Sequence, residues 1–360
     1  MEFRSNNSSL LSNITDDDGF SSLWGTPGAI YRSTLMLLTA ILSLSGNALC
    51  VWVLPHTKNI PEHNRLFLIS LSVADFGIGV GVLMYVAPAI AGQWIYNHGM
   101  CVALCCAISI FSGVSKNSLL CLSADRYIAI MKPLQYPMWV TRKRVLFLIG
   151  YIWFLDIVIV SVLFTPVLHI GPPIVYRPYA AVCVPNLTDP HFSIQAFCTG
   201  LFSFTIPLII IIFIYFKLYR VTVKQLRFIE ARQVYSDEDK KKKKSLRGEG
   251  KAIRMFTAVT LTFAIAWMPY AIAIPAVAFA NRPLPPNLEF FVYWLALSGS
   301  WFDAVTLALM NAGFRKTTRK ELENLTLSCG CSKLSSKIAP LEETVNNSSS
   351  GGRTLDTNVP

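Results

Sequence analysis

Charged side chains are scarce in this sequence. Asp, Glu, Lys and Arg together make up 15% of its 360 residues, and 53% of the residues are hydrophobic. Soluble domains carry roughly 25% charged residues. We therefore expect the lipid bilayer, rather than water, to be the main solvent of this chain.

Several other features are missing, and their absence narrows the function. The sequence holds no Gly-rich phosphate loop, no cluster of metal-ligating residues, and no set of nucleophile, base and acid, so no pattern favours an enzyme. Inverted repeats with broken helices, which are typical of transporters, are also missing. The chain opens on the polar stretch 1–19, so we expect no cleavable signal peptide and a first span that serves as the targeting signal.

Long apolar runs are what the sequence does have. A transmembrane helix needs about 20 mostly apolar residues. Runs of that length lie at 29–54, 66–91, 100–131, 145–168, 192–218, 253–280 and 288–310. They predict an all-α membrane protein, a seven-transmembrane helix bundle over residues 29–310. Residues 1–28 form an extracellular tail, 311–323 a short amphipathic interfacial helix, and 324–360 a disordered cytoplasmic tail.

The net charge of +11 does not indicate a nucleic-acid partner, because the basic residues occupy alternate connections between the spans. They lie at 58–65, 132–144, 240–247 and 315–320. The remaining connections hold only Arg177 and Arg282. By the positive-inside rule the N-terminus is extracellular and the C-terminus cytoplasmic, as in a multi-pass protein of the plasma membrane. The lysine run at 240–244 either extends two helices into the cytosol or is simply solvated.

Two kinds of modification signal agree with this orientation. Asn-x-Ser/Thr sequons on the outer side predict glycosylation at Asn6, Asn7, Asn13 and Asn186. Cys329 and Cys331 follow the amphipathic cytoplasmic stretch, where they are either palmitoylated or free thiols.

Polar residues inside the spans carry the functional signal, because an ionisable group there costs about 2.5–3.5 kcal/mol on insertion scales. They stand in Gly46-Asn47, Ala74-Asp75, Asp125-Arg126-Tyr127 and Trp267-Met268-Pro269. In order and spacing, residues 29–323 resemble the rhodopsin-like G-protein-coupled receptors. The stretches 118–133 and 267–269 look most like amine and adenosine receptors. The resemblance implies a cell-surface receptor whose partners are a small extracellular ligand, a heterotrimeric G-protein and arrestin.

The resemblance also assigns a switch at the cytoplasmic side. In the resting state Arg126 is held by Asp125 and by Glu249 at the base of the sixth helix, a charge pair that forms a two-state latch. Ligand binding moves the sixth helix outward about Pro269, which frees Arg126 and Tyr215 for the G-protein. The alternative is an interfacial Asp125–Arg126 pair with no switching role. The residues assigned to coupling are Asp125, Arg126, Tyr127, Tyr215, Glu249, Trp267 and Pro269.

A polar cluster in mid-membrane has two interpretations. In the family, such a cluster binds a sodium ion, and here it comprises Asn47, Asp75, Ser115, Ser300 and Asp303. Carboxylate, hydroxyl and amide oxygens suit a hard cation. The alternative is that one aspartate is protonated and shares a hydrogen bond with the other. No other cofactor is implied.

The ligand site implied by the family lies under the loop between spans four and five. We predict that a disulfide joins Cys101, which opens the third span, to Cys183 of that loop, because both face an oxidising compartment. The residues expected around the ligand are Ile108, Ser109, Ser112, Thr199, Ser203, Trp267, Tyr270, Glu289 and Tyr293.

Three of the family's ligand-determining positions differ here. Amine receptors keep an aspartate where this chain has Ile108, so a protonated amine is disfavoured unless Glu289 replaces that partner. Ile274 stands at the position of the adenosine receptors' asparagine, and Leu297 at that of the opsins' retinal-binding lysine. These two residues argue against a purine ligand and against a photoreceptor that binds retinal as a Schiff base.

Two further departures bear on signalling. The seventh span ends in Asp303-Ala304-Val305-Thr306-Leu307, without the family's proline and tyrosine, so we expect a straighter helix and a Tyr215 without its usual partner. Lys116 lies in mid-membrane, where it pairs with Asp156, is neutral, or merely tolerates its site. The main hypothesis is thus a G-protein-coupled receptor. The competing ones are a signalling-silent scaffold or dimer partner with a receptor fold, and a transporter.

Overall fold

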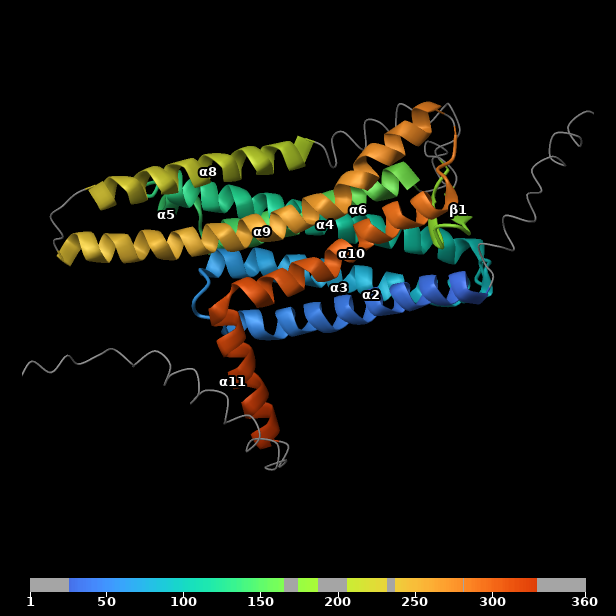
Figure 1. Cartoon of the computed structure of the whole chain (residues 1–360), viewed down its shortest axis with the longest axis horizontal. Coiled ribbons are helices and arrows are strands. Elements are labelled where there is room, and N and C mark those ends of the chain that lie inside the picture. Colours follow the sequence, from blue (N-terminus) through green and yellow to red (C-terminus); the bar gives the residue numbers. More distant parts are fainter. Residues whose placement is uncertain (1–25, 165–173, 187–205, 232–236, 281, 329–360) are drawn as a thin grey trace, which may run out of the picture.

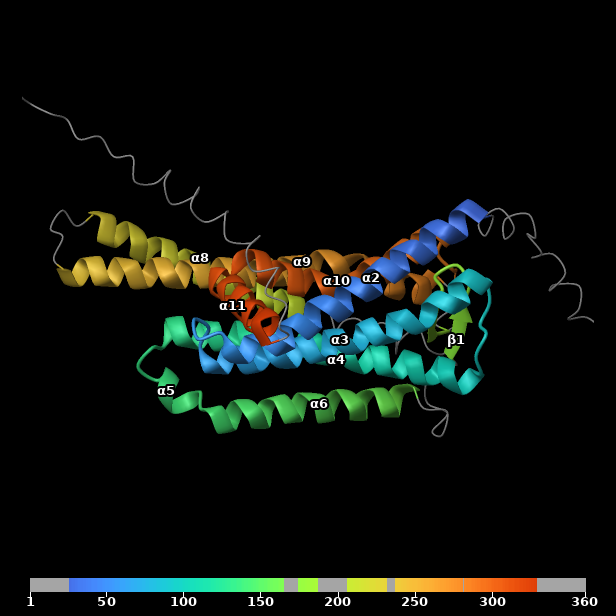
Figure 2. The same cartoon turned by 90° about the horizontal axis from the view of Figure 1, so that it is seen from below.

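Long helices lying side by side make up the computed structural model, which describes residues 26–164, 174–186, 206–231, 237–280 and 282–328 (Figures 1 and 2). The bundle consists of α2 (Thr26–Val53), α3 (Glu62–Ala91), α4 (His98–Met131), α6 (Arg142–Phe164), α8 (Ile206–Ala231), α9 (Asp237–Ala280) and α10 (Pro286–Met310). Six stretches within the described residues are long and apolar enough to cross a membrane. The seventh expected span, 192–218, starts outside the described residues, and α8 contains the rest of it.

The connections after α2 and after α4 are short and partly helical. The 3-10 helix η1 (Leu54–His56) follows α2, and the four-residue helix α5 (Tyr136–Trp139) joins α4 to α6. The lysine-rich run belongs to α9, whose Asp237 end reaches, together with α8, past the other helices of the bundle (Figures 1 and 2). The structure therefore selects the first of the two alternatives for this run, an extension of the helices.

A proline-containing bend marks α9. Pro269 and Pro275 both lie inside this helix, and its orange half turns away from the direction of its yellow half (Figure 1). Proline removes one backbone hydrogen bond, and its ring clashes with the carbonyl four residues earlier, so it is the expected cause of such a bend. By contrast, α10 runs as one helix whose prolines stand only at its first turn.

Small residues allow α3 and α4 to approach closely. A Cβ on Gly77 would lie 2.6 Å from the Phe111 ring, and a Cβ on Gly81 would lie 2.8 Å from Ile108. Glycines four residues apart share one helix face, and this is a common way for membrane helices to pack. The contact fixes the face of α4 that carries Ile108.

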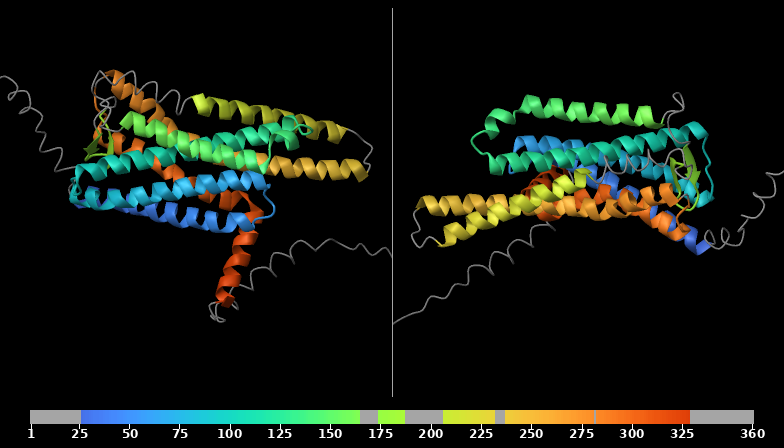
Figure 3. Two further views of the ribbon diagram at one scale, coloured as in Figure 1. Left: turned by 180° about the vertical axis from the view of Figure 1, so that it is seen from behind. Right: turned by 90° about the horizontal axis from the view of Figure 1, so that it is seen from above.

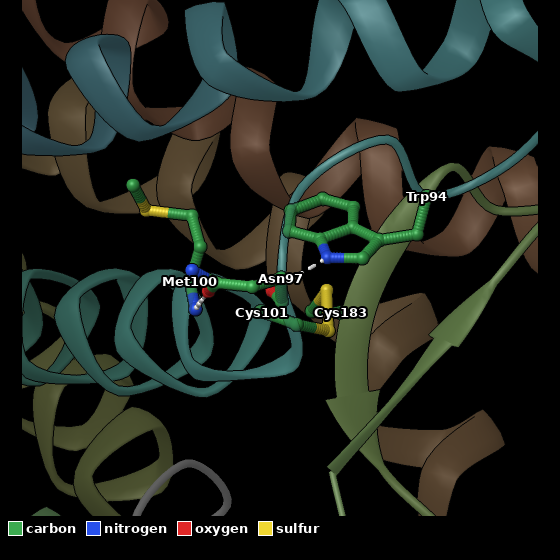
Figure 4. Close-up of a disulfide and its surroundings, with 5 residues drawn as sticks. All are labelled: Trp94, Asn97, Met100, Cys101 and Cys183. Carbon is green, nitrogen blue, oxygen red and sulfur yellow. Dashed lines mark hydrogen bonds between the residues drawn. A yellow bond between two sulfur atoms is a disulfide. The ribbon is translucent and has the colours of Figure 1, made fainter.

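The loop after α6 contains a small antiparallel hairpin that the sequence did not predict. Its strands are β1 (Ile174–Arg177) and β2 (Val182–Pro185), with Tyr176 opposite Cys183. The predicted disulfide between Cys101 and Cys183 is confirmed (Figure 4). Cys101 is held in the first turn of α4, which Asn97 caps by accepting a hydrogen bond from the Met100 amide at 2.8 Å.

The hairpin lies over one end of the bundle (Figure 3), and side chains of α2 and α10 hold it there. The Trp294 indole of α10 donates to the Ala180 carbonyl at 2.6 Å. Arg32 of α2, which is buried, donates to the Tyr179 carbonyl at 3.3 Å and to Asn287 of α10 at 3.0 Å. The hairpin is thus fixed at its turn as well as at its disulfide.

Helix α11 (Ala312–Ser328) leaves the bundle at a steep angle to α10 (Figures 1 and 3). Asn311 caps it by accepting from the Phe314 amide at 2.9 Å, and the buried Phe314 ties its first turn to the bundle. The helix runs to Ser328, so the end predicted at residue 323 was too early. The predicted palmitoylation sites Cys329 and Cys331 lie outside the described residues.

Candidate functional site

A cavity of about 160 Å³ lies beneath the hairpin, between α4, α6, α9 and α10. Strand β2 covers it with Val182, Cys183, Val184 and Pro185. Six of the residues expected from the sequence come together in its wall: Ile108, Ser109, Ser112, Trp267, Tyr270 and Tyr293. Thr199 and Ser203 lie outside the described residues. Leu297 lines the cavity as well.

Glu289 is not where the sequence placed it. It stands in a separate, smaller cavity of about 20 Å³, where its carboxylate lies 3.7 Å from the Arg177 guanidinium of β1. Ile274 lines this small cavity, and Tyr293 borders both cavities. Arg177 was recognised in the sequence only as a loop residue, because the pairing depends on the hairpin that brings it back over α10. Glu289 therefore serves the hairpin and not the main cavity.

The floor of the main cavity is charged. Lys116 of α4 and Asp156 of α6 both line it, and they are close enough for their opposite charges to attract each other. Asn117 donates to Asp156 at 3.0 Å. A Cβ on Gly113 would lie 2.4 Å from the Asp156 carboxylate, so only glycine lets this side chain rest on the α4 backbone.

Aromatic rings connect the cavity to the interior of α9. Tyr293 contacts Tyr270, Tyr270 contacts Trp267, and Trp267 stacks on Phe263, with ring centroids 5.5, 5.6 and 5.8 Å apart. Phe263 and Trp267 are buried within the two turns that precede Pro269. A molecule in the cavity therefore contacts the same helix segment that contains the proline.

The mid-membrane polar cluster surrounds two buried aspartates. Asn47 donates to the Ser300 carbonyl at 3.0 Å, and Ser43, which the sequence analysis missed, donates to Ser300 at 2.9 Å. Ser115 faces Asp75. Yet both Asp75 carboxylate oxygens and Oδ1 of Asp303 have no hydrogen-bond partner of normal geometry among the described residues. Three buried acceptors are thus left for a proton or a cation.

Near the C-terminal end of α4, Arg126 donates to Asp125 at 3.1 Å. The Tyr136 hydroxyl of α5 donates to the other Asp125 oxygen at 3.0 Å. Burial and the neighbouring Asp125 carboxylate both raise the pKa of Tyr136, so this hydroxyl stays a donor at neutral pH. Tyr127 packs at the edge of the core beside this pair. The side chain of Glu249, the second predicted partner of Arg126, lies outside what the structure describes.

Tyr215 of α8 is buried and accepts a hydrogen bond from Ser123 of α4 at 3.3 Å. In α10, Leu307 fills the position at which the family's tyrosine was expected, and it is buried in the core. In place of the family's tyrosine, Tyr215 has Ser123 as a hydrogen-bond partner, and this bond joins α8 to α4.

Comparison with known proteins fits this arrangement. A sequence model described as 7 transmembrane receptor (rhodopsin family) matches residues 46–335. The chain belongs to the rhodopsin family of seven-transmembrane receptors. Members of this family are receptors that signal through G-proteins, so this chain is a multi-pass membrane receptor and not an enzyme.

Individual relatives of this receptor are similar over most of their length. Trace amine-associated receptor 9 of Rattus norvegicus is 27% identical over 81% of this chain and 87% of its own. G-protein coupled receptor 52 of Mus musculus is 26% identical over 91% and 92%. The octopamine receptor beta-1R of Drosophila melanogaster is 25% identical over 86% and 65%.

The receptor's site contains residues that the sequence analysis did not single out. Tyr136 and Gly113 are the most important, and neither sits in a recognisable motif. The role of Tyr136 depends on the turn at α5, which folds its hydroxyl back onto α4. That of Gly113 depends on the neighbouring helix, whose Asp156 occupies the space of a side chain.

Proposed function

We propose that this receptor converts the binding of a small extracellular ligand in the cavity beneath the hairpin into activation of a heterotrimeric G-protein. The observation that carries this proposal is the Asp125–Arg126 pair, which lies at the opposite end of α4 from the cavity. The Tyr136 hydroxyl donates a hydrogen bond to Asp125 of this pair. The pair itself lies within α4, and the Tyr136–Asp125 hydrogen bond links it to α5. Such a linked arrangement can act as a two-state switch when a ligand favours one of its states.

The route from ligand to switch follows α9. A ligand that pushes on Trp267 or Tyr270 acts on residues directly beside Pro269, where α9 bends. Rotation about a proline bend displaces the long cytoplasmic half of a helix more than its short extracellular half. The displacement separates α9 from α4 and exposes Arg126, Tyr127 and Tyr215, with Glu249 as a resting-state partner of Arg126.

A sodium ion in the polar cluster fits the resting state. Asp75, Ser115 and Asp303 supply its oxygen ligands, supported by Asn47 and Ser300. The three partnerless carboxylate oxygens support this assignment, because two nearby carboxylates need either a cation or a shared proton. An ion that holds α3 and α10 together at this depth opposes the movement of the helices.

The remaining features follow from the orientation of the bundle. We place the N-terminus outside the plasma membrane and the cytoplasmic ends of α8 and α9 inside, with arrestin as a second cytoplasmic partner. Asn186, next to β2, is the glycosylation site within the described residues, and Asn6, Asn7 and Asn13 lie outside them. Palmitoylation of Cys329 and Cys331 holds α11 at the membrane surface.

One observation favours a second candidate, a signalling-silent scaffold or dimer partner. Ala304 and Leu307 are both buried where the family has a proline and a tyrosine, and Leu307 packs in the core. A tyrosine hydroxyl that would receive Tyr215 in an active state is therefore lacking in α10. The Tyr215–Ser123 hydrogen bond argues for the receptor, because it gives Tyr215 another polar partner.

The test is basal nucleotide exchange on G-proteins in cell membranes. Native chain and Arg126→Ala are compared at equal surface expression, and Arg142→Ala serves as the matched control. Arg142 is a cytoplasmic arginine whose pair with Glu62 is exposed. Exchange that falls in Arg126→Ala and persists in Arg142→Ala supports the proposal. Equal exchange in all three chains contradicts it.

A further inference from the structure

We propose that the ligand of the main cavity carries a carboxylate, and that this carboxylate binds the Lys116 ammonium and the Ser112 hydroxyl. The inference rests on the proposed function, since it names the chemical class of the ligand for the same cavity. It assigns the ligand a charge opposite to that of an amine.

Three polar residues of the cavity wall lie on one face of α4. Ser109, Ser112 and Lys116 follow one another at spacings of three and four, which is the spacing of neighbours on a helix surface. All three line the cavity. Lys116 and Asp156 are the charged side chains in the described lining. The charge preference of the cavity therefore depends on which of the two interacts with the ligand.

Asp156 is already committed to protein groups. Its carboxylate rests against the backbone of α4 at Gly113, accepts a hydrogen bond from Asn117 at 3.0 Å, and attracts Lys116. A carboxylate fixed in this way is a built-in counter-charge for Lys116. It makes the lysine tolerable in mid-membrane, where an unpaired ammonium is costly.

Ser112 and Lys116 both offer hydrogen-bond donors on the face of α4 that lines the cavity. The Ser112 hydroxyl is buried, with 5% of the residue exposed, and has no hydrogen-bond partner among the described residues. An ammonium has three N–H donors and cannot accept a hydrogen bond. A carboxylate can therefore accept from Ser112 and Lys116 together, and charge-assisted bonds of this kind are the stronger ones. An ammonium on the ligand would instead be repelled by Lys116.

The size and walls of the cavity limit the rest of the ligand. A cavity of about 150 Å³ holds a benzene ring, and this one measures about 160 Å³. Ile108, Val160 and Trp267 give it apolar sides above the charged floor. The ligand class that fits is a small carboxylic acid with one ring or a short aliphatic chain.

The experiment uses the full chain, purified in lipid nanodiscs, and measures dissociation constants from thermal-shift titrations. The probes are phenylacetate, phenylpropionate and phenylbutyrate, together with phenethylamine, phenylpropylamine and phenylbutylamine. We expect at least one acid of the series to bind and the amine of the same length to bind more weakly or not at all. Lys116→Gln should weaken acid binding about 10- to 100-fold, as expected for the loss of a charged hydrogen-bond partner.

Three further variants keep the test sharp. Lys116→Arg retains the positive charge and should therefore retain the preference for acids over amines. It also tests the role of the charge if Lys116→Gln does not fold. Ser112→Ala should weaken acid binding about 2- to 10-fold, the effect of one neutral hydrogen bond. Lys217→Gln is the matched control, because this lysine lies on α8 against Phe213 and does not line the cavity. It should leave acid binding unchanged.

The inference is overturned if the amines bind at least as tightly as the acids. It is also overturned if no acid of the series binds, or if Lys116→Gln binds acids as the native chain does. These titrations contain no G-protein. Acid binding without any nucleotide exchange would thus refute the proposed function alone, whereas exchange in a chain that binds no acid would refute the ligand class alone.

Discussion

Replacing Asp156 by Asn tests the energetics of the cavity floor. The amide has the size of the carboxylate and still accepts from Asn117, so the change removes little besides the charge that faces Lys116. Lys116 has 5% of its surface exposed and Asp156 has 8%. Removing one member of a buried ion pair costs about 3–5 kcal/mol. We expect about 3 kcal/mol, the lower end, because the amide oxygen can still accept from the ammonium.

The assay is thermal unfolding of the purified chain in detergent. Its matched control is Glu62→Gln, which neutralises a carboxylate 3.2 Å from Arg142 in a pair whose side chains are 67% and 44% exposed. Exposed pairs contribute about 1 kcal/mol or less, so this variant should unfold close to the native midpoint. Lys116→Met combined with Asp156→Asn should recover most of the lost stability, because no buried charge is left without its opposite.

Two results would refute this reasoning. One is an Asp156→Asn variant that unfolds at the same temperature as Glu62→Gln, which would mean that the Lys116–Asp156 attraction contributes no more than a surface pair. The other is a double variant less stable than Asp156→Asn, which would mean that Lys116 is stabilised by groups other than Asp156.

Three further outcomes follow from the site. Tyr136→Phe removes a hydrogen bond of 3.0 Å from Asp125 and should raise basal nucleotide exchange by up to about tenfold; unchanged or lower exchange would contradict the latch. The native chain should unfold at a higher temperature in about 150 mM sodium chloride than in the same concentration of choline chloride, and Asp75→Asn should abolish this difference. An equal effect of both salts on the native chain would favour a proton shared by the two aspartates instead. Cys183→Ser opens a disulfide between residues 82 apart in sequence and should lower stability by about 2–5 kcal/mol, measured by thermal unfolding, whereas a smaller loss would mean that Arg32 and Trp294 suffice to hold the hairpin.

Features with a strong local signal could be predicted from the sequence. Apolar runs of membrane-spanning length predicted the bundle, and the positions of Cys101 and Cys183 predicted the disulfide. Spacing along one helix also predicted which side chains meet in the cavity, since Ile108, Ser109 and Ser112 share a face of α4.

Features that depend on distant partners could not be predicted. Arg32 is a single arginine at the start of an apolar run, and its partners lie 147 and 255 residues away. The hairpin has strands of four residues, too short for a clear alternation of apolar and polar side chains. Because the hairpin was missed, Arg177 was not recognised as the partner of Glu289, which lies with it in the small cavity.

The central claim is that the native chain itself couples to a G-protein although α10 lacks the family's proline and tyrosine. The most direct measurement compares basal nucleotide exchange of the native chain with that of Ala304→Pro combined with Leu307→Tyr, each with and without Arg126→Ala. We predict that native and restored chains both promote exchange and that both lose it with Arg126→Ala. Exchange by the restored chain alone would contradict the claim and identify the native protein as a signalling-silent scaffold.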